Sequence, residues 1–546
     1  MSSTWWVLWP RILNILLIIC TSVFLGRWLV GSVGSATGWY LKRRASTRKR
    51  AILRRVKVEE EAFQRFSERS QRPAEDDDWE QIESYGAASA KNGGQAEDEW
   101  EGIVGFFHPF CNAGGGGERV LWAAIRATQK RWPKAVCVVY TGDHDSTKPA
   151  ILERVQNRFN IRLHPPTVVF IYLSTRHYVL STTYPHFTLL GQSLGSLVLA
   201  YDAFSLLVPD IFIDTMGYAF TLALCKFFFP TIPTGAYVHY PTISTDMLGS
   251  LDAEQGMGLN AGSGKGLKGA LKRKYWQRFA SLYSWVGGNV DVVMTNSSWT
   301  LGHIRSLWGP SRKKRQKTFD IEVVFPPVAV EELERAIEIS ESSEAKREPA
   351  LLYVAQFRPE KNHALILRAF SLMLERDKDH RNIKLVLAGS VRNSEDATRV
   401  YDLRLLAHEL KVKDHVEFLC DAPWSEILQR LRKSWVGVNA MWNEHFGIGV
   451  VEYQAAGLLS VVNDSGGPKS DIVVDHSGGP TGFHASTESE FAEGFQQALT
   501  MSSQDTLAMR RRARASARRF TEEAFAKAWL TQMGRLIELQ SSTGRL

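Results

Sequence analysis

Two glutamates in one short run are the residues of this chain best suited to do chemistry. Glu444 and Glu452 are separated by seven mostly small, apolar residues. A buried carboxylate is costly unless it is paired or hydrogen-bonded, and a glycine-rich turn leading into a helix binds anions through its backbone N–H groups. The run therefore predicts that one carboxylate holds sugar hydroxyls, the other ribose hydroxyls, and the amides a phosphate. The alternative is a buried helix with two incidental glutamates.

A basic loop upstream supplies the opposite charge. Residues 351–355 read as a buried strand, and Arg358 and Lys361 follow it before a helical pattern begins. Ligands of open α/β folds bind at the carboxyl edge of the parallel sheet. There an arginine grips a phosphate with two N–H groups and a lysine with a point charge. We therefore predict an anion site, with a solvated loop of ordinary surface cations as the alternative.

A third loop, near the start of the ordered chain, is rich in glycine. Residues 102–107 form an apolar strand pattern, and four consecutive glycines, residues 114–117, lie between it and a helical pattern. Glycines allow the backbone to approach a ligand closely, and their amides can face a phosphate. A dinucleotide-binding fold is not favoured, because no acidic residue stands at the usual distance. Four glycines are also more than a tight turn needs.

These motifs, in this order, resemble glycosyltransferase family 4. The match is most specific in four segments, residues 108–122, 139–143, 237–244 and 441–447. Within the family they resemble the α-1,2-mannosyltransferases that extend the dolichol-linked oligosaccharide of asparagine-linked glycosylation. The resemblance implies an α/β, GT-B fold, in which two Rossmann-like, doubly wound domains face a cleft. It covers residues 102–546, apart from a glycine-rich insert near 256–269.

The resemblance also implies an activity. It is retaining transfer of mannose from GDP-mannose to dolichol-pyrophosphate-linked Man3GlcNAc2 and then Man4GlcNAc2, on the cytosolic face of the endoplasmic reticulum. Expected partners are therefore the nucleotide sugar, the lipid-linked oligosaccharide and the ER membrane, with other mannosyltransferases of the pathway as candidates. No metal and no cofactor are expected. The alternatives are a family 4 hexosyltransferase with another donor or acceptor, a phosphorylase-like or hydrolytic enzyme, and a non-catalytic membrane scaffold.

Motif matches carry the family's site residues onto this chain. The implied catalytic set neutralises the donor diphosphate and holds the sugar: Arg358, Lys361, Glu444 and His239. The implied donor-binding set comes from both domains: Gly115, Gly116, Ser390, Phe446, Gly447, Ile448 and Glu452. Glu444 would hold mannose hydroxyls and Glu452 the ribose.

Composition fits a membrane-associated enzyme in a reducing compartment. The five cysteines show neither paired nor metal-type spacing. Fourteen histidines occur without a metal-binding pattern, so no metal site is predicted. The pI near 9.1 is compatible with nucleic acid, but no recognition motif accompanies the charge and much of it lies near the N-terminus. We therefore expect no nucleic-acid partner.

The N-terminus predicts a membrane anchor, assigned to residues 1–41. Residues 5–26 are long enough to span a bilayer, and no small-residue cleavage site follows. Nine Lys and Arg residues between positions 42 and 57 place the following chain in the cytosol. The sequon at Asn296 should then carry no glycan. Residues 42–101, first basic and then acidic, are predicted to be a largely disordered linker, with a surface amphipathic helix over 51–66 as the alternative.

The rest of the chain divides into three parts. Residues 102–322 form the expected acceptor- and membrane-facing domain, 323–520 the nucleotide-sugar-binding domain, and 521–546 a C-terminal helix that is a candidate to cross back. The apolar stretch 187–229 is read as core, with an in-plane membrane surface as the alternative. A helix with interleaved cations and aromatics is a candidate to contact the lipid-linked acceptor or the membrane, and a solvated helix with a core face is the alternative. Its cations are Lys268, Lys272, Arg273, Lys274 and Arg278.

Overall fold

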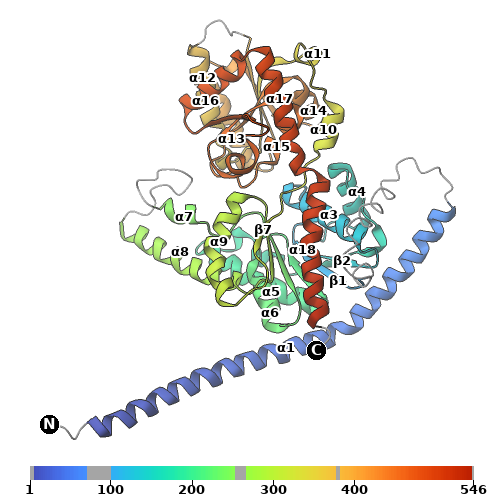
Figure 1. Ribbon diagram of the computed structural model, residues 1–546, viewed down its shortest axis with the longest axis vertical. Helices are drawn as coiled ribbons and strands as arrows, with labels where there is room; N and C mark the ends of the chain where they lie inside the picture. The colour runs from blue at the N-terminus through green and yellow to red at the C-terminus, as the bar shows by residue number, and fades with distance from the viewer. Residues whose placement is uncertain (1–4, 70–99, 252–265, 377–381, 544–546) are drawn as a thin grey trace.

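The structure consists of two α/β domains, one above the other, with a long helix beneath them (Figure 1). It is a computed structural model that describes residues 5–69, 100–251, 266–376 and 382–543, without the side chains of residues 5–24, 27 and 67–69. The acidic half of the predicted linker and most of the glycine-rich insert lie outside these residues.

The first domain is built on a sheet of seven parallel strands in the order β3-β2-β1-β4-β5-β6-β7. Its strands are short apolar runs, as expected for a sheet that is covered on both faces. They are β1 (Ile103–Phe107), β2 (Val136–Thr141), β3 (Val168–Tyr172), β4 (Ile211–Asp214), β5 (Thr234–Val238), β6 (Val292–Thr295) and β7 (Ile321–Val323). The helices are α3 (Gly116–Arg131), α4 (Lys148–Phe159), α5 (Thr188–Leu206), α6 (Ala219–Phe228), α7 (Thr245–Gly249), α8 (Gly266–Gly287) and α9 (Ser298–Lys314), with short η3 (Pro165–Thr167), η4 (Arg176–Val179) and η5 (Ser181–Thr183).

The second domain repeats the plan with six parallel strands in the order β10-β9-β8-β11-β12-β13. They are β8 (Glu348–Val354), β9 (Lys384–Gly389), β10 (Val416–Cys420), β11 (Ser434–Asn439), β12 (Leu459–Asn463) and β13 (Gly482–Ala485). Its helices are α10 (Val330–Ala336), α11 (Glu341–Glu344), α12 (His363–Arg376), α13 (Ser394–Glu409), α14 (Trp424–Lys433), α15 (Ile448–Ala456), α16 (Glu488–Thr500) and α17 (Ser503–Ala517), with short η6 (Pro359–Lys361), η7 (Lys413–His415), η8 (Pro468–Ile472) and η9 (Arg518–Phe520).

The predicted pair of doubly wound domains is confirmed. In each sheet the strand order reverses once, between β1 and β4 in the first and between β8 and β11 in the second. Open α/β folds bind ligands outside the carboxyl ends of the strands at this reversal. One boundary needs a small correction: Val323 pairs with Thr295 in the first sheet, so it belongs to the first domain.

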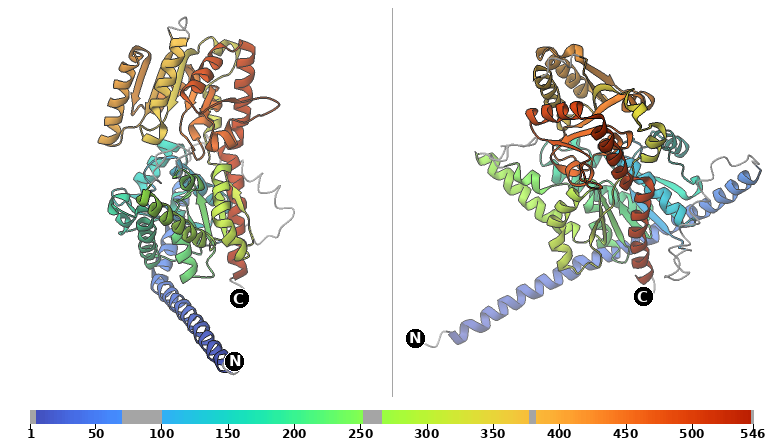
Figure 2. Two further views of the ribbon diagram at one scale, coloured as in Figure 1. Left: turned by 90° about the vertical axis from the view of Figure 1, so that its left-hand side faces the viewer. Right: turned by 45° about the horizontal axis from the view of Figure 1, so that its top comes forward.

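The last helix, α18 (Glu522–Thr543), returns to the first domain and runs along its side (Figure 2). It packs against α3, β4 and β6. Phe525, Trp529, Met533 and Leu536 are fully buried in the first domain's core, where Trp529 stacks on Phe106. The two domains are therefore joined by two chain crossings.

The helix α1 (Trp5–Arg69) corrects the predicted linker, because residues 42–69 are helical. Its buried side chains include Leu41, Ala45 and Val56, which recur at helical spacing and pack on the first domain. Lys49 adds an ion pair with Asp210 at 2.6 Å. Packing of this kind stabilises a helix whose composition alone favours disorder. The side chains of the predicted membrane span lie outside the description, so the anchor stays a prediction.

The helix α5 is the one helix among the described residues that is long and apolar enough to cross a membrane, and 39% of it is buried. Its buried face carries Leu199 and Phe204 together with small residues, and its outward face is apolar as well. Small residues such as Ser196, Ala200 and Ala203 face the core, whereas Phe187 just before the helix, Leu194, Val198 and Tyr201 are exposed. At about 100° per residue these four exposed side chains fall within an arc of about 60°. Exposing such an apolar face to water is energetically unfavourable.

Candidate active site

The predicted site residues lie on loops at the carboxyl ends of the strands. The glycine loop follows β1, and His239 follows β5. In the second domain Arg358 and Lys361 follow β8 and Glu444 follows β11, the two strands at which the order reverses. Within each sheet, the parallel strands bring these segments to the same edge, although they are far apart in the chain.

The centre of the site is an ion pair between Lys361 Nζ and Glu444 Oε2. The two side chains keep only 21% and 14% of their surface exposed. Burial works to raise the pKa of Glu444, but the Lys361 ammonium holds it below the ordinary value. Asn439 Nδ2 also approaches the same oxygen at 3.5 Å. Glu444 is thus a buried carboxylate that stays ionised because a cation is bound to it.

The loop that carries Lys361 is held by its neighbours. Tyr353 Oη donates a hydrogen bond of 2.6 Å to the Lys361 carbonyl, and Asn362 turns the chain into α12 with a φ of 50°. Arg358 has only a long contact with Glu360, at 3.6 Å, and its buried Nε has no hydrogen-bond partner among the residues described. The loop therefore presents one cation, Lys361, that is paired with Glu444, and a second, Arg358, that has no close ion-pair partner within the described part of the chain.

The N-termini of α15 and α3 meet between the domains. Gly447 begins α15 with a φ of 105°, a conformation that glycine adopts easily. A methyl group placed on Gly116, at the start of α3, would lie 2.7 Å from Ile448 Cδ1 of α15. Both helices leave their first N–H groups without intrahelical partners. Two helix N-termini, each with a partial positive charge, therefore face the same space.

On the first domain, buried polar groups support the glycine loop. Glu118 Oε2 accepts a 2.5 Å hydrogen bond from the Gly115 N–H, and its other oxygen lies 3.6 Å from His108 Nε2. Burial works to raise the pKa of Glu118, but the contact with His108 and backbone N–H groups hold it below the ordinary value. His108 in turn meets Thr215 Oγ1 at 2.8 Å.

His239 lies behind the glycine loop. Its Nε2 is buried with no hydrogen-bond partner in the described chain, and a methyl group on Gly117 would lie 3.7 Å from it. Burial lowers the pKa of His239 to about 4, and nearby His108 lowers it further. The imidazole is therefore neutral at physiological pH, with one nitrogen free to bond a ligand.

Glu452 lies on α15, eight positions after Glu444, and differs from it in state. Burial raises the pKa of Glu452 to about 7, and Arg119 of α3 partly opposes the rise. Arg119 Nη2 is itself bound to Glu522 of α18 at 2.7 Å. No hydrogen bond or ion pair to Glu452 occurs among the described residues, so its carboxyl group is available to a ligand.

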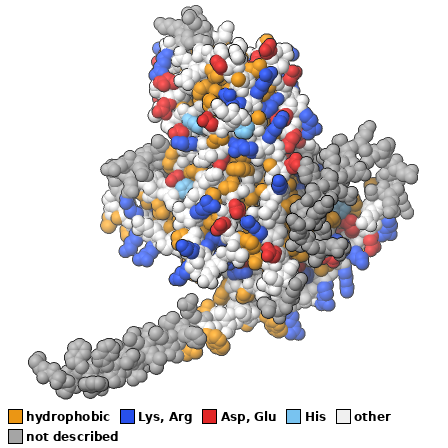
Figure 3. Space-filling view, viewed as in Figure 1, with side chains coloured by type: hydrophobic (Ala, Val, Ile, Leu, Met, Phe, Trp, Pro, Cys, Tyr) orange, Lys and Arg blue, Asp and Glu red, His pale blue; other side chains and the backbone are white. Residues whose placement is uncertain are grey.

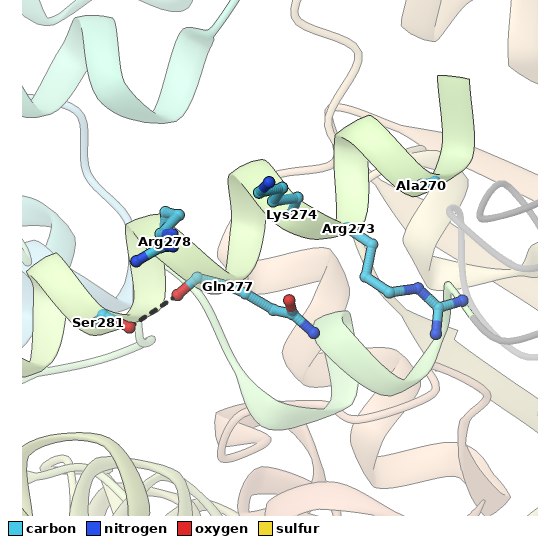
Figure 4. Close-up of a pocket in the computed structure, with 6 residues that line it drawn as sticks. All are labelled: Ala270, Arg273, Lys274, Gln277, Arg278 and Ser281. Carbon is cyan, nitrogen blue, oxygen red and sulfur yellow. Dashed lines mark hydrogen bonds between the residues drawn. The ribbon is translucent and has the colours of Figure 1, made fainter. Parts of the chain in front are cut away.

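The predicted acceptor or membrane candidates form a separate group. They lie on α8, which packs against α6, α7 and α9 on the first domain's outer side. Figure 4 shows Arg273, Lys274 and Arg278 spreading from one helix around a hollow of about 520 Å³. The structure therefore does not gather them with Glu444. Ser390, at the end of β9, is partly buried, and no described contact joins it to the ion pair.

Several polar residues of this edge were not predicted. They are His108, Glu118, Arg119, Asp214 and Asn439. Burial raises the pKa of Asp214 to about 7, although its carboxylate accepts hydrogen bonds from Met216 and Gly217 N–H groups. These five residues lie either next to a predicted motif or at the end of a strand, and that position is the sequence signal from which they could have been predicted. Among the described residues, no group of three or more His, Cys, Asp or Glu is arranged to hold a metal ion.

Comparisons with families and solved structures agree with this architecture. Residues 101–308 match the model of the ALG11 mannosyltransferase N-terminus, and residues 334–520 match glycosyl transferases group 1. The fold is similar to that of Anabaena Alr3699/HepE crystallised with UDP and glucose, with a TM-score of 0.53 at 14% identity over 80% of this chain and all of that one. It is also similar to a Burkholderia multivorans α,α-trehalose 6-phosphate synthase, with a TM-score of 0.57 at 13% identity over 81% and 100%.

Curated relatives are much closer in sequence. A Neurospora crassa protein named GDP-Man:Man(3)GlcNAc(2)-PP-Dol alpha-1,2-mannosyltransferase is 59% identical over 520 residues, 93% of each chain. The human protein of the same name is 46% identical over 443 residues, 80% of this chain and 87% of its own length. With this identity spread over both domains, the chain is a glycosyltransferase of the GT-B fold and belongs to the family of GDP-Man:Man3GlcNAc2-PP-Dol α-1,2-mannosyltransferases.

Proposed function

We propose that this enzyme transfers mannose from GDP-mannose to dolichol-pyrophosphate-linked Man3GlcNAc2, and then to Man4GlcNAc2, with retention of configuration. The names of the relatives support the donor and the first acceptor. The observation that carries the proposal is the buried Lys361–Glu444 pair beside two facing helix N-termini. It offers cationic groups for a diphosphate and a carboxylate for sugar hydroxyls within one space.

Arg358 and Lys361 bind the diphosphate of the donor. The glycosidic bond breaks with negative charge developing on the leaving phosphate, and fixed cations stabilise that charge most in the transition state. The available Nε of Arg358 suits this role. The amides of Phe446, Gly447 and Ile448, together with Gly115 and Gly116 across the interface, complete an anion site in which no metal is needed.

Glu444 binds mannose hydroxyls and His239 contacts the same sugar. The carboxylate is ionised, so it accepts hydrogen bonds from hydroxyls. His239 is neutral, so its unpartnered nitrogen can bond a hydroxyl without placing a second cation beside the sugar. Glu452, whose carboxyl group has no described partner, binds the ribose, and Ser390 lines the nucleotide side.

The first domain lies on a membrane, which we propose to be the cytosolic face of the endoplasmic reticulum. The exposed stripe of α5 supports a lipid contact, because the bilayer removes apolar area from water. Gly34 of α1 lets that helix lie against α6, where a methyl group would fall 2.7 Å from Phe227. Trp28 and Trp39 of α1 are exposed, and aromatic side chains of this kind favour membrane interfaces.

Charge along α1 supports the same orientation. Figure 3 shows hydrophobic side chains where α1 leaves the body and Lys and Arg side chains along its continuation. Lys42, Arg43 and Arg44 are exposed directly after the buried Leu41, and such a cluster attracts an anionic leaflet. The outer stripe of α8 mixes exposed Leu271 with cations, so we assign α8 to the headgroup region and to the pyrophosphate of the acceptor.

Turnover with defined substrates tests the activity. Purified enzyme with GDP-mannose and dolichol-linked Man3GlcNAc2 should yield products extended by one and then two mannoses, and UDP-sugars should not replace the donor. Transfer from a UDP-sugar, or hydrolysis without transfer, would contradict the proposal. EDTA should leave the rate unchanged. Strict dependence on an added divalent ion would reject the metal-free site.

An environment-sensitive fluorophore tests the membrane face. It is attached at Leu194→Cys in a background where Cys20 and Cys420 are serine, and the protein is reconstituted in phosphatidylcholine–phosphatidylserine vesicles. Emission should shift to the blue. The same label at Leu405→Cys, an exposed leucine of α13 in the second domain, is the control and should not shift. Equal spectra at both positions would contradict the proposed contact between α5 and the membrane.

A further inference from the structure

Both neighbours of Glu444 are held by the opposite domain. Asn443 Nδ2 donates a hydrogen bond of 2.6 Å to Asp246 Oδ2 on α7. The His445 ring lies between Tyr240 and Trp299, with centroid distances of 4.2 Å and 5.4 Å. Tyr240, Asp246 and Trp299 belong to the first domain, whereas Glu444 belongs to the second.

Asp246 is itself fixed within the first domain. His303 Nε2 lies 3.4 Å from its carboxylate, and His303 Nδ1 meets Thr245 Oγ1 at 2.6 Å. The ring of His303 also packs edge-on against Trp299, 4.1 Å between centroids. We call Tyr240, Asp246, Trp299 and His303 the first-domain brace. The brace presents one oriented acceptor to the Glu444 loop.

On the second domain, the backbone of the same loop has little freedom. Asn443 adopts a left-handed conformation, with a φ of 53°, and its N–H donates to Ser465 Oγ at 2.7 Å. The Glu444 carbonyl accepts a 2.7 Å hydrogen bond from Gly467. A strained, doubly held backbone next to a reactive group is a device for keeping its side chain in place.

We propose that Asp246 is a positioning residue for Glu444, acting through Asn443. The inference rests on the proposed role of Glu444. Because Asp246 and Asn443 lie on different domains, the carboxylate reaches its final position only when the two domains are together. The enzyme thereby avoids presenting a fully assembled sugar site while the domains are apart. The acceptor-facing domain thus contributes to the geometry of the donor site without touching the donor.

Exchange of the two side chains tests the proposal. Asn443→Asp alone opposes two carboxylates at hydrogen-bond distance, so kcat should fall about 10- to 100-fold, the range for a lost hydrogen bond to a charged group plus repulsion. The double variant Asn443→Asp with Asp246→Asn restores one donor and one carboxylate, so kcat should return to within about threefold of the parent. Circular dichroism melting establishes that each variant is folded, and Asp246→Ala replaces Asn443→Asp if the latter is not.

A second cross-domain pair supplies the matched control. Asn160 Nδ2 donates to Glu332 Oε1 at 2.8 Å between α4 and α10, away from Glu444. Asn160→Asp should change kcat less than twofold. Failure of the exchanged pair to recover, or an equal loss in Asn160→Asp, would overturn the proposal, because the effect would then be general to the interface. An active Glu444→Gln enzyme would instead reject the role of Glu444, which is a different failure.

Discussion

The raised pKa of Glu452 predicts that donor binding strengthens as the pH rises through neutrality. Burial raises the pKa of this carboxyl group from its ordinary value to about 7. A ribose hydroxyl donates a stronger hydrogen bond to a carboxylate than to a neutral carboxylic acid. If Glu452 holds the ribose, only the ionised fraction of the enzyme binds GDP-mannose well.

The size of the effect follows from the titration curve. With a pKa near 7, about a tenth of the carboxyl groups are ionised at pH 6 and about nine-tenths at pH 8. The apparent affinity for GDP-mannose should therefore rise close to tenfold over this range. GDP-mannose suits the measurement better than GDP, because GDP carries a terminal phosphate that titrates near pH 6.

Calorimetric titration of GDP-mannose at several pH values, without acceptor, measures this directly. Glu452→Gln should bind weakly and with no pH dependence between 6 and 8. Glu444→Gln is the control: the pKa of Glu444 lies below its ordinary value, so this variant should keep the slope. A slope that survives in Glu452→Gln, or disappears in Glu444→Gln, would refute the assignment of the two carboxylates.

Stability should change in the opposite direction. A carboxyl group whose folded pKa is raised imposes no penalty below its unfolded value, and the penalty grows between pH 4.5 and about 7. Above pH 7 the cost is at most about 3 kcal/mol, less to the extent that the partly buried side chain meets solvent. Glu452→Gln should therefore melt at a higher temperature than the parent at pH 8 and at the same temperature at pH 4. An unchanged melting temperature at pH 8 would mean that the carboxylate is well solvated.

Three further predictions address the rest of the site and its orientation. Arg358→Ala and Lys361→Ala should each lower kcat about 10²- to 10³-fold and leave the melting temperature unchanged. A loss of less than tenfold would show that the residue does not stabilise the transition state. Because Lys361 also keeps Glu444 ionised, part of the Lys361→Ala loss should be recovered as pH rises, whereas the Arg358→Ala loss should not; equal pH profiles would contradict this. Added protease should digest the catalytic domains in intact microsomes, and protection from the protease would contradict the cytosolic orientation. The absence of a glycan at Asn296 does not report this orientation, because Asn296 is 4% exposed and would resist glycosylation in either compartment.

The sequence predicted strands and the helix starts that follow them well, because both depend on local patterns. The apolar run at residues 351–355 became the end of β8, and the expected helix after the Glu444 turn begins at Ile448. Residues 509–519, a run rich in arginine, lie in α17 and η9. Arg510 in that helix is fully buried, bonded to the Trp435 carbonyl and paired with Glu344, so basic composition alone does not show which face of a helix is exposed.

Contacts between distant residues could not be predicted in the same way. Asn443 and Asp246 are 197 positions apart, and the local sequence around neither residue predicts a contact with the other. A helix over residues 51–66 was predicted only as the alternative to a disordered linker, and its continuity with residues 42–50 was missed. The helix depends on packing against a domain that follows later in the chain. Glu118 was not predicted although it lies three residues after Gly115, because its role depends on a hydrogen bond with the Gly115 N–H that only the folded loop shows.

The return of α18 to the first domain has a consequence for the order in which the protein is made. The first domain's core includes Trp529 and Leu536, which leave the ribosome after the whole second domain. Until then Phe106 lacks its stacking partner, and the apolar side chains that α18 covers are open to water. The first domain therefore cannot complete its core until the last two dozen residues have been made. A frameshift or stop codon after residue 520 would remove no predicted site residue, yet it should make the first domain the part that proteases degrade first.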